Sequence, residues 1–126
     1  MWESDAKSGI GADYHRFVIP FCAMAAIIVL TTAGSKDEAK RIAQSLVESR
    51  LAACVNMINK VESVYRWEDN VQTAEEWLLL IKTTSANFEP VKEAIHKLHS
   101  YELPECISVE IADAEEGYMK WIKENT

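Results

Sequence analysis

The chain of 126 residues has only three cysteines, Cys22, Cys54 and Cys106, and they lie far apart in the sequence. An odd, widely spaced set does not form a disulfide framework, and the absence of a CxxC pair excludes a zinc ribbon or a thioredoxin-like motif. We therefore expect reduced packing residues in a cytoplasmic protein. A chain of this length can bury a core without disulfides or a structural metal.

Glycine is also scarce. The four glycines are scattered, and Gly34, which follows an apolar run, has no second glycine nearby. A nucleotide-binding loop needs several glycines at fixed spacing, so none is predicted. No Ser-His-Asp or Cys-His pattern is present either, and we expect that the protein is not an enzyme.

Positive charge is in deficit. The chain has 13 Lys and Arg residues against 20 Asp and Glu residues, which gives a formal net charge of −7. An acidic surface repels the phosphates of nucleic acids and anionic lipids, so neither is expected as a partner. The same surface is compatible with attracting cations.

No apolar run reaches the roughly 20 residues that span a bilayer as a helix, so membrane insertion is not expected. The longest run, 17–30, has 14 residues and contains Pro20. The polar residues before it have no regular period, which predicts a disordered or weakly ordered extension over 1–24 and a folded domain over 25–126. Two alternatives are a signal peptide, although its flank is not basic, and a shorter product that starts at Met24.

Hydrophobic periodicity predicts the elements of the folded domain. Strands are predicted over 25–31, 53–67, 71–84 and 106–111, and a helix over 36–50 that starts with a capping box of Ser35 and Glu38. A second helix, which Ser85 or Asn87 is expected to cap, has Pro90 in its first turn, and a loop follows over 99–105. Asp113 and Glu116 are expected to cap a short C-terminal helix, which three apolar residues would anchor: Tyr118, Trp121 and Ile122.

The predicted order is β-α-β-β-α-β-α, an α+β arrangement. Its first six elements are the split β-α-β of the ferredoxin-like fold, an antiparallel sheet with helices on one face, and the C-terminal helix is added to it.

The two middle strands form a long hairpin that indicates an oligomer. At about 13 residues each they exceed the usual strand of roughly 5–6 residues, so the hairpin should project from the body. It carries Tyr65, Trp67 and Trp77, which would lie in an interface of a closed symmetric assembly. The alternative is that a bulge at Asn59-Lys60 bends the hairpin back onto its own sheet.

Several segments together resemble the CutA, or divalent-cation tolerance, family. They are IIVLTT, KDEAKRIAQSLVESRLAACVNMI, SVYRWEDNVQ, LLLIKTT, HSYELPE and YMKWI, and they cover about residues 25–123. The resemblance implies a ferredoxin-like protomer in a homotrimer with a PII-like architecture. It also implies a link to divalent-cation tolerance, especially the response to copper.

The resemblance also implies a copper site, but this chain departs from it. The family's proposed ligands are a Cys at the end of the first strand and a His-His pair before the Tyr-Glu loop. Those positions correspond to Thr31, Leu98 and His99, and only His99 retains a ligand. Thr and Leu are poor copper ligands, because copper prefers thiolate and imidazole.

A different metal set is available nearby. His96 and His99 lie at i and i+3 of a helix, and Glu102 follows closely. Imidazole and carboxylate suit copper or zinc, so these are the candidate metals, although no cofactor is required. The structural alternative is an exposed His96 and a His99 that caps the helix C-terminus.

Lys82 is the second candidate, because it follows five apolar residues on a central strand. A buried lysine is rarely unpaired, so Lys82 either pairs with a carboxylate such as Glu102 or holds an anionic ligand in a cleft. Trp67 and Tyr101 could wall that cleft, or could be core and interface residues. Two functions follow: a metal-tolerance trimer, and a PII-like signalling or scaffold module that binds a small anion or a protein between subunits.

Overall fold

The computed structural model describes residues 25–126, so the extension expected over 1–24 lies outside the described residues. A four-stranded antiparallel sheet has the order β2-β3-β1-β4. This is the ferredoxin-like arrangement that the sequence predicts. The elements are β1 Ala26–Ala33, α1 Lys36–Glu48, β2 Cys54–Trp67, β3 Asn70–Thr84, the 3₁₀ turn η3 Ser85–Asn87, α2 Phe88–Leu98, β4 Ile107–Glu110 and α3 Glu116–Glu124.

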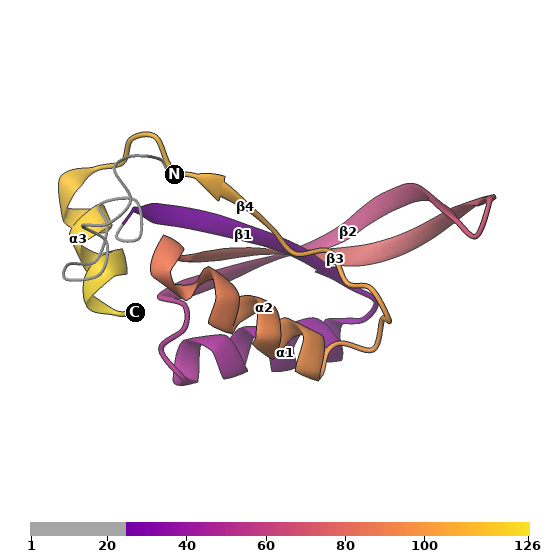
Figure 1. The fold of residues 1–126 in the computed structure, drawn as a ribbon, viewed down its shortest axis with the longest axis horizontal. Coiled ribbons are helices and arrows are strands. Elements are labelled where there is room, and N and C mark those ends of the chain that lie inside the picture. The colour runs from indigo at the N-terminus through magenta and orange to yellow at the C-terminus, as the bar shows by residue number, and fades with distance from the viewer. Residues whose placement is uncertain (1–24) are drawn as a thin grey trace, which may run out of the picture.

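Helices α1 and α2 cover one face of the sheet (Figure 1). Alternate residues of β1 and β3 point toward them, as the period of two in a strand requires. Both helices present an apolar stripe to these strands. The resulting core includes Val29, Leu79, Ile81, Ile42, Leu46, Val91 and Ile95, all fully buried.

The start of α1 differs slightly from the predicted capping box. The Oγ of Ser35 accepts a hydrogen bond from the backbone N–H of Glu38, as predicted. The Glu38 carboxylate accepts from the N–H of Gly34, one residue before the cap, rather than from Ser35 itself. It thereby satisfies a donor at the helix start and leaves its second oxygen for another element.

The hairpin of β2 and β3 projects beyond the helices (Figure 1). Its register shifts between Ile58 and Val61, and Lys60 has a φ of 71°, which confirms the irregularity expected at Asn59-Lys60. Pairing continues through Trp67 and Asn70 beyond this bulge, so the hairpin does not fold back onto its own sheet.

Three details of how α2 and α3 are capped and anchored correct the predictions. The cap of α3 is Glu115 and not Asp113, because the Glu115 carboxylate accepts the N–H of Tyr118. Ile122 is fully buried and anchors the helix, whereas Tyr118 and Trp121 are 41% and 40% exposed. Asn87 precedes α2 without a side-chain cap, and its amide donates to Thr83 instead.

The second face of the sheet has no helix over most of its area (Figure 1). Directly opposite residues of an antiparallel pair point to the same face, so Ile28 shares this face with Val109, and Leu30 shares it with Ile107. Ile107 and Val109 are each 51% exposed. We call this surface the open sheet face; its other apolar members are Leu78, Leu80 and Ile58.

Candidate functional site

A cavity of about 780 Å³ lies between the hairpin and the loop of residues 99–105. We call it the hairpin cavity. The hairpin contributes aromatic rings from Tyr65 and Trp67, and the loop contributes Tyr101. Carboxylates line it as well: Glu76, Glu102 and Glu105.

The bulge in β2 determines which hairpin side chains reach this cavity. Ile58 pairs with Leu78 and Val61 pairs with Glu76, so β2 has one residue more than β3 across this interval. Because side chains of a strand alternate between the two faces of the sheet, one extra residue moves the side chains of β2 that follow it to the opposite faces. Tyr65 and Trp67 consequently share the hairpin face of Glu76.

Glu76 forms the buried polar floor of the cavity and is only 6% exposed. The Ser63 hydroxyl donates to its Oε1 at 2.6 Å, and the Tyr101 hydroxyl donates to its Oε2 at 2.6 Å. Burial and this hydrogen bond to Glu76 raise the pKa of Tyr101 well above its usual range. Tyr101 therefore stays a neutral donor and ties the loop to the hairpin.

The cavity is negatively charged. None of the residues that line it is Lys, Arg or His. Burial raises the pKa of Glu105, and the charge of Glu76 raises it further. The carboxylates thus repel one another with no basic residue in the lining to offset them.

Beneath the loop, His99 is buried and uses both ring nitrogens. Its Nε2 lies 2.5 Å from the carbonyl oxygen of Thr32, and its Nδ1 accepts the backbone N–H of Tyr101 at 3.0 Å. These partners fit a neutral ring that carries its proton on Nε2. His99 therefore fixes the start of the loop against β1.

Glu38 connects α1 to the same loop. Its Oε2 accepts the backbone N–H of Ser100 at 2.6 Å and lies 3.6 Å from Nδ1 of His99. Burial alone would raise the pKa of Glu38, but the hydrogen bonds from Ser100 and Gly34 hold it below its ordinary value. The loop is thus held by hydrogen bonds from α1, β1 and the hairpin.

The predicted metal set is not assembled. Glu102 lies in the hairpin cavity, His99 is buried behind the loop, and His96 lies on the outer side of α2. Among the described residues, no three His, Cys, Asp or Glu side chains form a group that could hold a metal ion.

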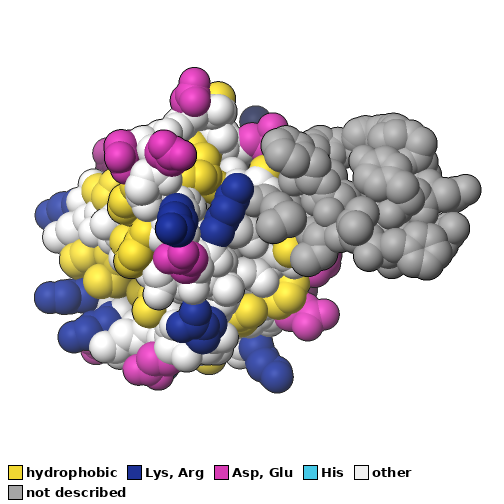
Figure 2. Space-filling view, turned by 90° about the vertical axis from the view of Figure 1, so that its left-hand side faces the viewer, with side chains coloured by type: hydrophobic (Ala, Val, Ile, Leu, Met, Phe, Trp, Pro, Cys, Tyr) yellow, Lys and Arg dark blue, Asp and Glu magenta, His cyan; other side chains and the backbone are white. Residues whose placement is uncertain are grey.

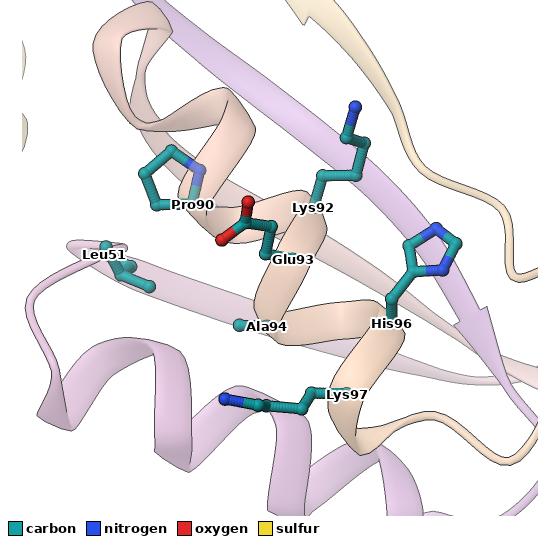
Figure 3. A pocket seen from close by; sticks show the side chains of 7 residues that line it. All are labelled: Leu51, Pro90, Lys92, Glu93, Ala94, His96 and Lys97. Carbon is teal, nitrogen blue, oxygen red and sulfur yellow. The ribbon is translucent and has the colours of Figure 1, made fainter.

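His96 lines a separate surface hollow of about 930 Å³ on α2. Figure 3 shows Lys92 and His96 extending to one side of the helix while Lys97 extends to the other. Lys92 forms an ion pair with Glu89 at 2.8 Å. Because its polar side chains diverge, this hollow has no convergent set of ligands.

Lys82 does not belong to the hairpin cavity. Its Nζ donates to Oδ1 of Asn56 at 2.6 Å and lies 5.8 Å from the ring centroid of Tyr118 on α3. The expected pairing with Glu102 is wrong, since no ion pair to Lys82 occurs among the described residues. Lys82 lies on the open sheet face near the end that α3 covers.

Of the other sequence candidates, Tyr65, Trp67 and Tyr101 meet in the hairpin cavity, while Trp77 packs half-buried against the core. The sequence reasoning missed Glu76, which lines the cavity. A signal for Glu76 was available, because it precedes the run of apolar residues on β3 and a carboxylate there needs partners.

Comparison with known proteins identifies the family. Residues 27–125 match the family described as CutA1 divalent ion tolerance protein. The divalent-cation tolerance protein CutA of Thermus thermophilus is 44% identical over 99 residues, which cover 79% of this chain and 96% of that protein. The chloroplastic CutA of Arabidopsis thaliana is 40% identical over 100 residues, and the match spans 55% of its length.

Solved structures of CutA proteins have the same fold as this chain. The T. thermophilus CutA1 structure has a TM-score of 0.79 and covers 80% of this chain and 98% of its own. CutA from Archaeoglobus fulgidus, described as periplasmic, is 34% identical with a TM-score of 0.77, and the match covers 79% of this chain and 97% of its own. No helix within residues 25–126 is long and apolar enough to cross a membrane. The chain therefore belongs to the CutA1 family of divalent ion tolerance proteins.

Proposed function

We propose that this protein is a non-catalytic homotrimer that acts in cellular tolerance of divalent cations, copper among them. Family membership supports the tolerance role. A cytoplasmic location is part of the proposal, and the free thiols of Cys54 and Cys106 support it.

The exposed apolar surface of the open sheet face is the observation that best supports the proposed trimer. Ile107, Val109 and Ile58 are 51%, 51% and 43% exposed on it, and Leu30 and Leu80 lie between them. A contiguous apolar surface on a sheet usually marks an interface. The hairpin adds Val64 and Val71, at 66% and 65% exposed, beyond the helices.

The test substitutes Ile107→Glu on the open sheet face. A charge buried at an apolar interface lacks a partner, so we expect the trimer to dissociate into single chains on light scattering. In a strain that lacks its own CutA protein, this variant should also fail to restore growth in copper. The matched control is Val47→Glu on α1, where Val47 is 41% exposed outside that face. A trimeric Ile107→Glu variant would contradict the proposed interface.

We further propose that copper or zinc contacts the assembly through exposed side chains such as His96 and Glu102, with ligands from more than one subunit. Imidazole and carboxylate suit these metals. One protomer offers no group of three such ligands within residues 25–126, which favours a shared site. Calorimetric titration of metal-free protein should give a defined stoichiometry that His96→Ala abolishes. Binding that survives in His96→Ala but not in His99→Ala would contradict this assignment.

A second candidate function is a PII-like module that signals through a bound ligand or a protein partner. The hairpin cavity favours it, because its volume of about 780 Å³ and its aromatic walls are typical of small-molecule sites. Its negative charge disfavours the small anion that the sequence suggested.

A further inference from the structure

The open sheet face has opposite charges at its two ends. Alternate side chains of β3 share this face, so it presents Glu76, then Leu78 and Leu80, and then Lys82. At about 3.3 Å per residue, the two charged residues lie about 20 Å apart along the strand. Glu76 lies in the hairpin cavity, whereas Lys82 lies beside α3, at the other end of the molecule (Figure 1).

Neither charge has an opposite partner among the described residues. The Nζ atom of Lys82 donates to the neutral amide of Asn56 and forms no ion pair. In the cavity, Glu76 accepts hydrogen bonds from two hydroxyl groups. The carboxylate of Glu105 forms no hydrogen bond or ion pair with another described residue. The cavity therefore lacks a positive charge, and Lys82 lacks a negative one.

Contacts between subunits would bury both charges. This step rests on the proposed trimer, in which the open sheet face and the hairpin contact other copies of the chain. A lysine or a carboxylate that is buried without an opposite charge is strongly destabilising. Burial and the charge of Glu76 already raise the pKa of Glu105, so the two carboxylates repel each other. A cation between them would relieve this repulsion.

Lys82 is the one basic residue that the regular pairing of the described strands places on the open sheet face. Arg66 lies between Tyr65 and Trp67 on β2, so it points to the opposite face of the hairpin. Lys60 lies in the bulge, where the pairing is interrupted, and β1 and β4 contain no Lys or Arg. The flexible stem of a lysine can carry its ammonium group into a cavity, where its N–H donors bind carboxylates.

We propose that Lys82 of one subunit inserts into the hairpin cavity of the next subunit and binds Glu76 and Glu105 there. In a closed ring, each subunit then gives its Lys82 to one neighbour and receives a lysine from the other. The cavity is completed by a second copy of the chain, and the rings of Tyr65 and Trp67 lie along the apolar stem of the lysine. Glu102 stays available to the proposed metal site.

Chemical cross-linking of the native chain tests the contact directly. Isotopically heavy and light chains are refolded together and treated with a carbodiimide, which takes up water as an amine and an adjacent carboxylate condense into an amide. We expect linked peptides that join Lys82 to Glu105, some of them with one heavy and one light member. Links whose two peptides always have the same label would place both residues in one chain and overturn the proposal.

Charge reversal tests whether the contact holds the subunits together. Lys82→Glu should raise the chain concentration at the midpoint of trimer dissociation by at least about thirtyfold, because it places a further carboxylate in the cavity. Adding Glu105→Lys restores an opposite pair and should recover at least about tenfold of that loss. Sedimentation velocity over a dilution series measures both. The matched control, Lys97→Glu on the exposed side of α2, changes the net charge equally and should shift the midpoint by less than about twofold.

The results separate this contact from the trimer itself. A midpoint that Lys82→Glu leaves unchanged, or that Glu105→Lys worsens further, would overturn the contact. Native trimers without any heavy–light link between Lys82 and Glu105 would overturn it while the proposed trimer stands. A native chain that sediments as a monomer would contradict the trimer and the contact together. Cross-linking uses the native chain, so it decides the question even where circular dichroism shows that a variant has not folded.

Discussion

The buried hydroxyl of Thr31 lowers the stability of the folded protein. Its side chain is fully buried on β1, and Oγ1 has no hydrogen-bond partner among the described residues. A buried hydroxyl without a partner costs free energy, and valine has nearly the same shape. We predict that Thr31→Val raises the free energy of unfolding by about 1 kcal/mol, measured by urea denaturation. Thr31→Ser keeps the hydroxyl and loses a methyl group, so it should be less stable than the native chain. A less stable Thr31→Val would mean that the hydroxyl is satisfied.

Glu38 makes stability depend on pH in acid. Its pKa is held below the ordinary value of 4.5, because the hydrogen bonds from Ser100 and Gly34 outweigh the effect of burial. Its contribution is therefore complete above pH 4.5 and is lost as the pH falls through the folded-state pKa. We predict that the loss of stability between neutral pH and that range is smaller in Glu38→Gln, measured by thermal unfolding. Identical pH dependence in both proteins would show that Glu38 is not a source of acid sensitivity.

His99 shows what residue type and spacing can predict from the sequence and what they cannot. The sequence identified it as a special residue, and the structural alternative of a role at the end of α2 is close to what is observed, since it is the C-cap residue. Its contact with Thr32 spans 67 positions of sequence, and no local pattern contains that information. A buried imidazole with both nitrogens bonded cannot be told from a metal ligand by spacing alone.

At the scale of elements, the hairpin turn has an unusual sequence for its geometry. Glu68 and Asp69 connect β2 to β3, with φ values of 50° and 67°. Two-residue turns with both φ values positive favour Asn-Gly, because the Cβ atom of most other residues clashes with the backbone in this left-handed conformation. We predict that Glu68→Asn/Asp69→Gly stabilises the protein by about 1 kcal/mol, measured by guanidinium denaturation. Lower stability would mean that these carboxylates make contacts elsewhere in the assembly.

For strands and helices with a clear hydrophobic periodicity, the sequence predicted the first and last residues to within a few positions. The capping error at α3 has a plain reason: Glu115 is not among the residues that usually cap helices, whereas Asp113 is. The bulge was predicted from the broken alternation at Asn59-Lys60, but not its consequence. One extra residue in β2 determines that Tyr65, Trp67 and Glu76 share a face, and this needs the register of both strands.

The hairpin cavity itself could not be predicted, because half of it is loop. Residues 99–105 have no period that fixes their path. Their position depends on long-range hydrogen bonds to Glu38, Thr32 and Glu76, which tie the loop to α1, β1 and β3. Trp67 and Tyr101 were chosen as candidates because they are aromatic, and only the fold brings them together.

At the scale of the whole molecule, the two ends of the protomer differ. Figure 2 shows the end that carries α3, where apolar side chains lie among side chains of both charges. This mixture is typical of a solvated surface. The open sheet face and the hairpin have a higher share of exposed apolar side chains, which is why we assign them to contacts between subunits.

The central claim is that the working unit is three copies of this chain. Native mass spectrometry of the unmodified protein tests it most directly, at micromolar concentration and near neutral pH. We predict a single dominant species with three times the 14.2 kDa mass of the chain. A dominant single chain or dimer would contradict the trimer and leave the open sheet face without its proposed partner.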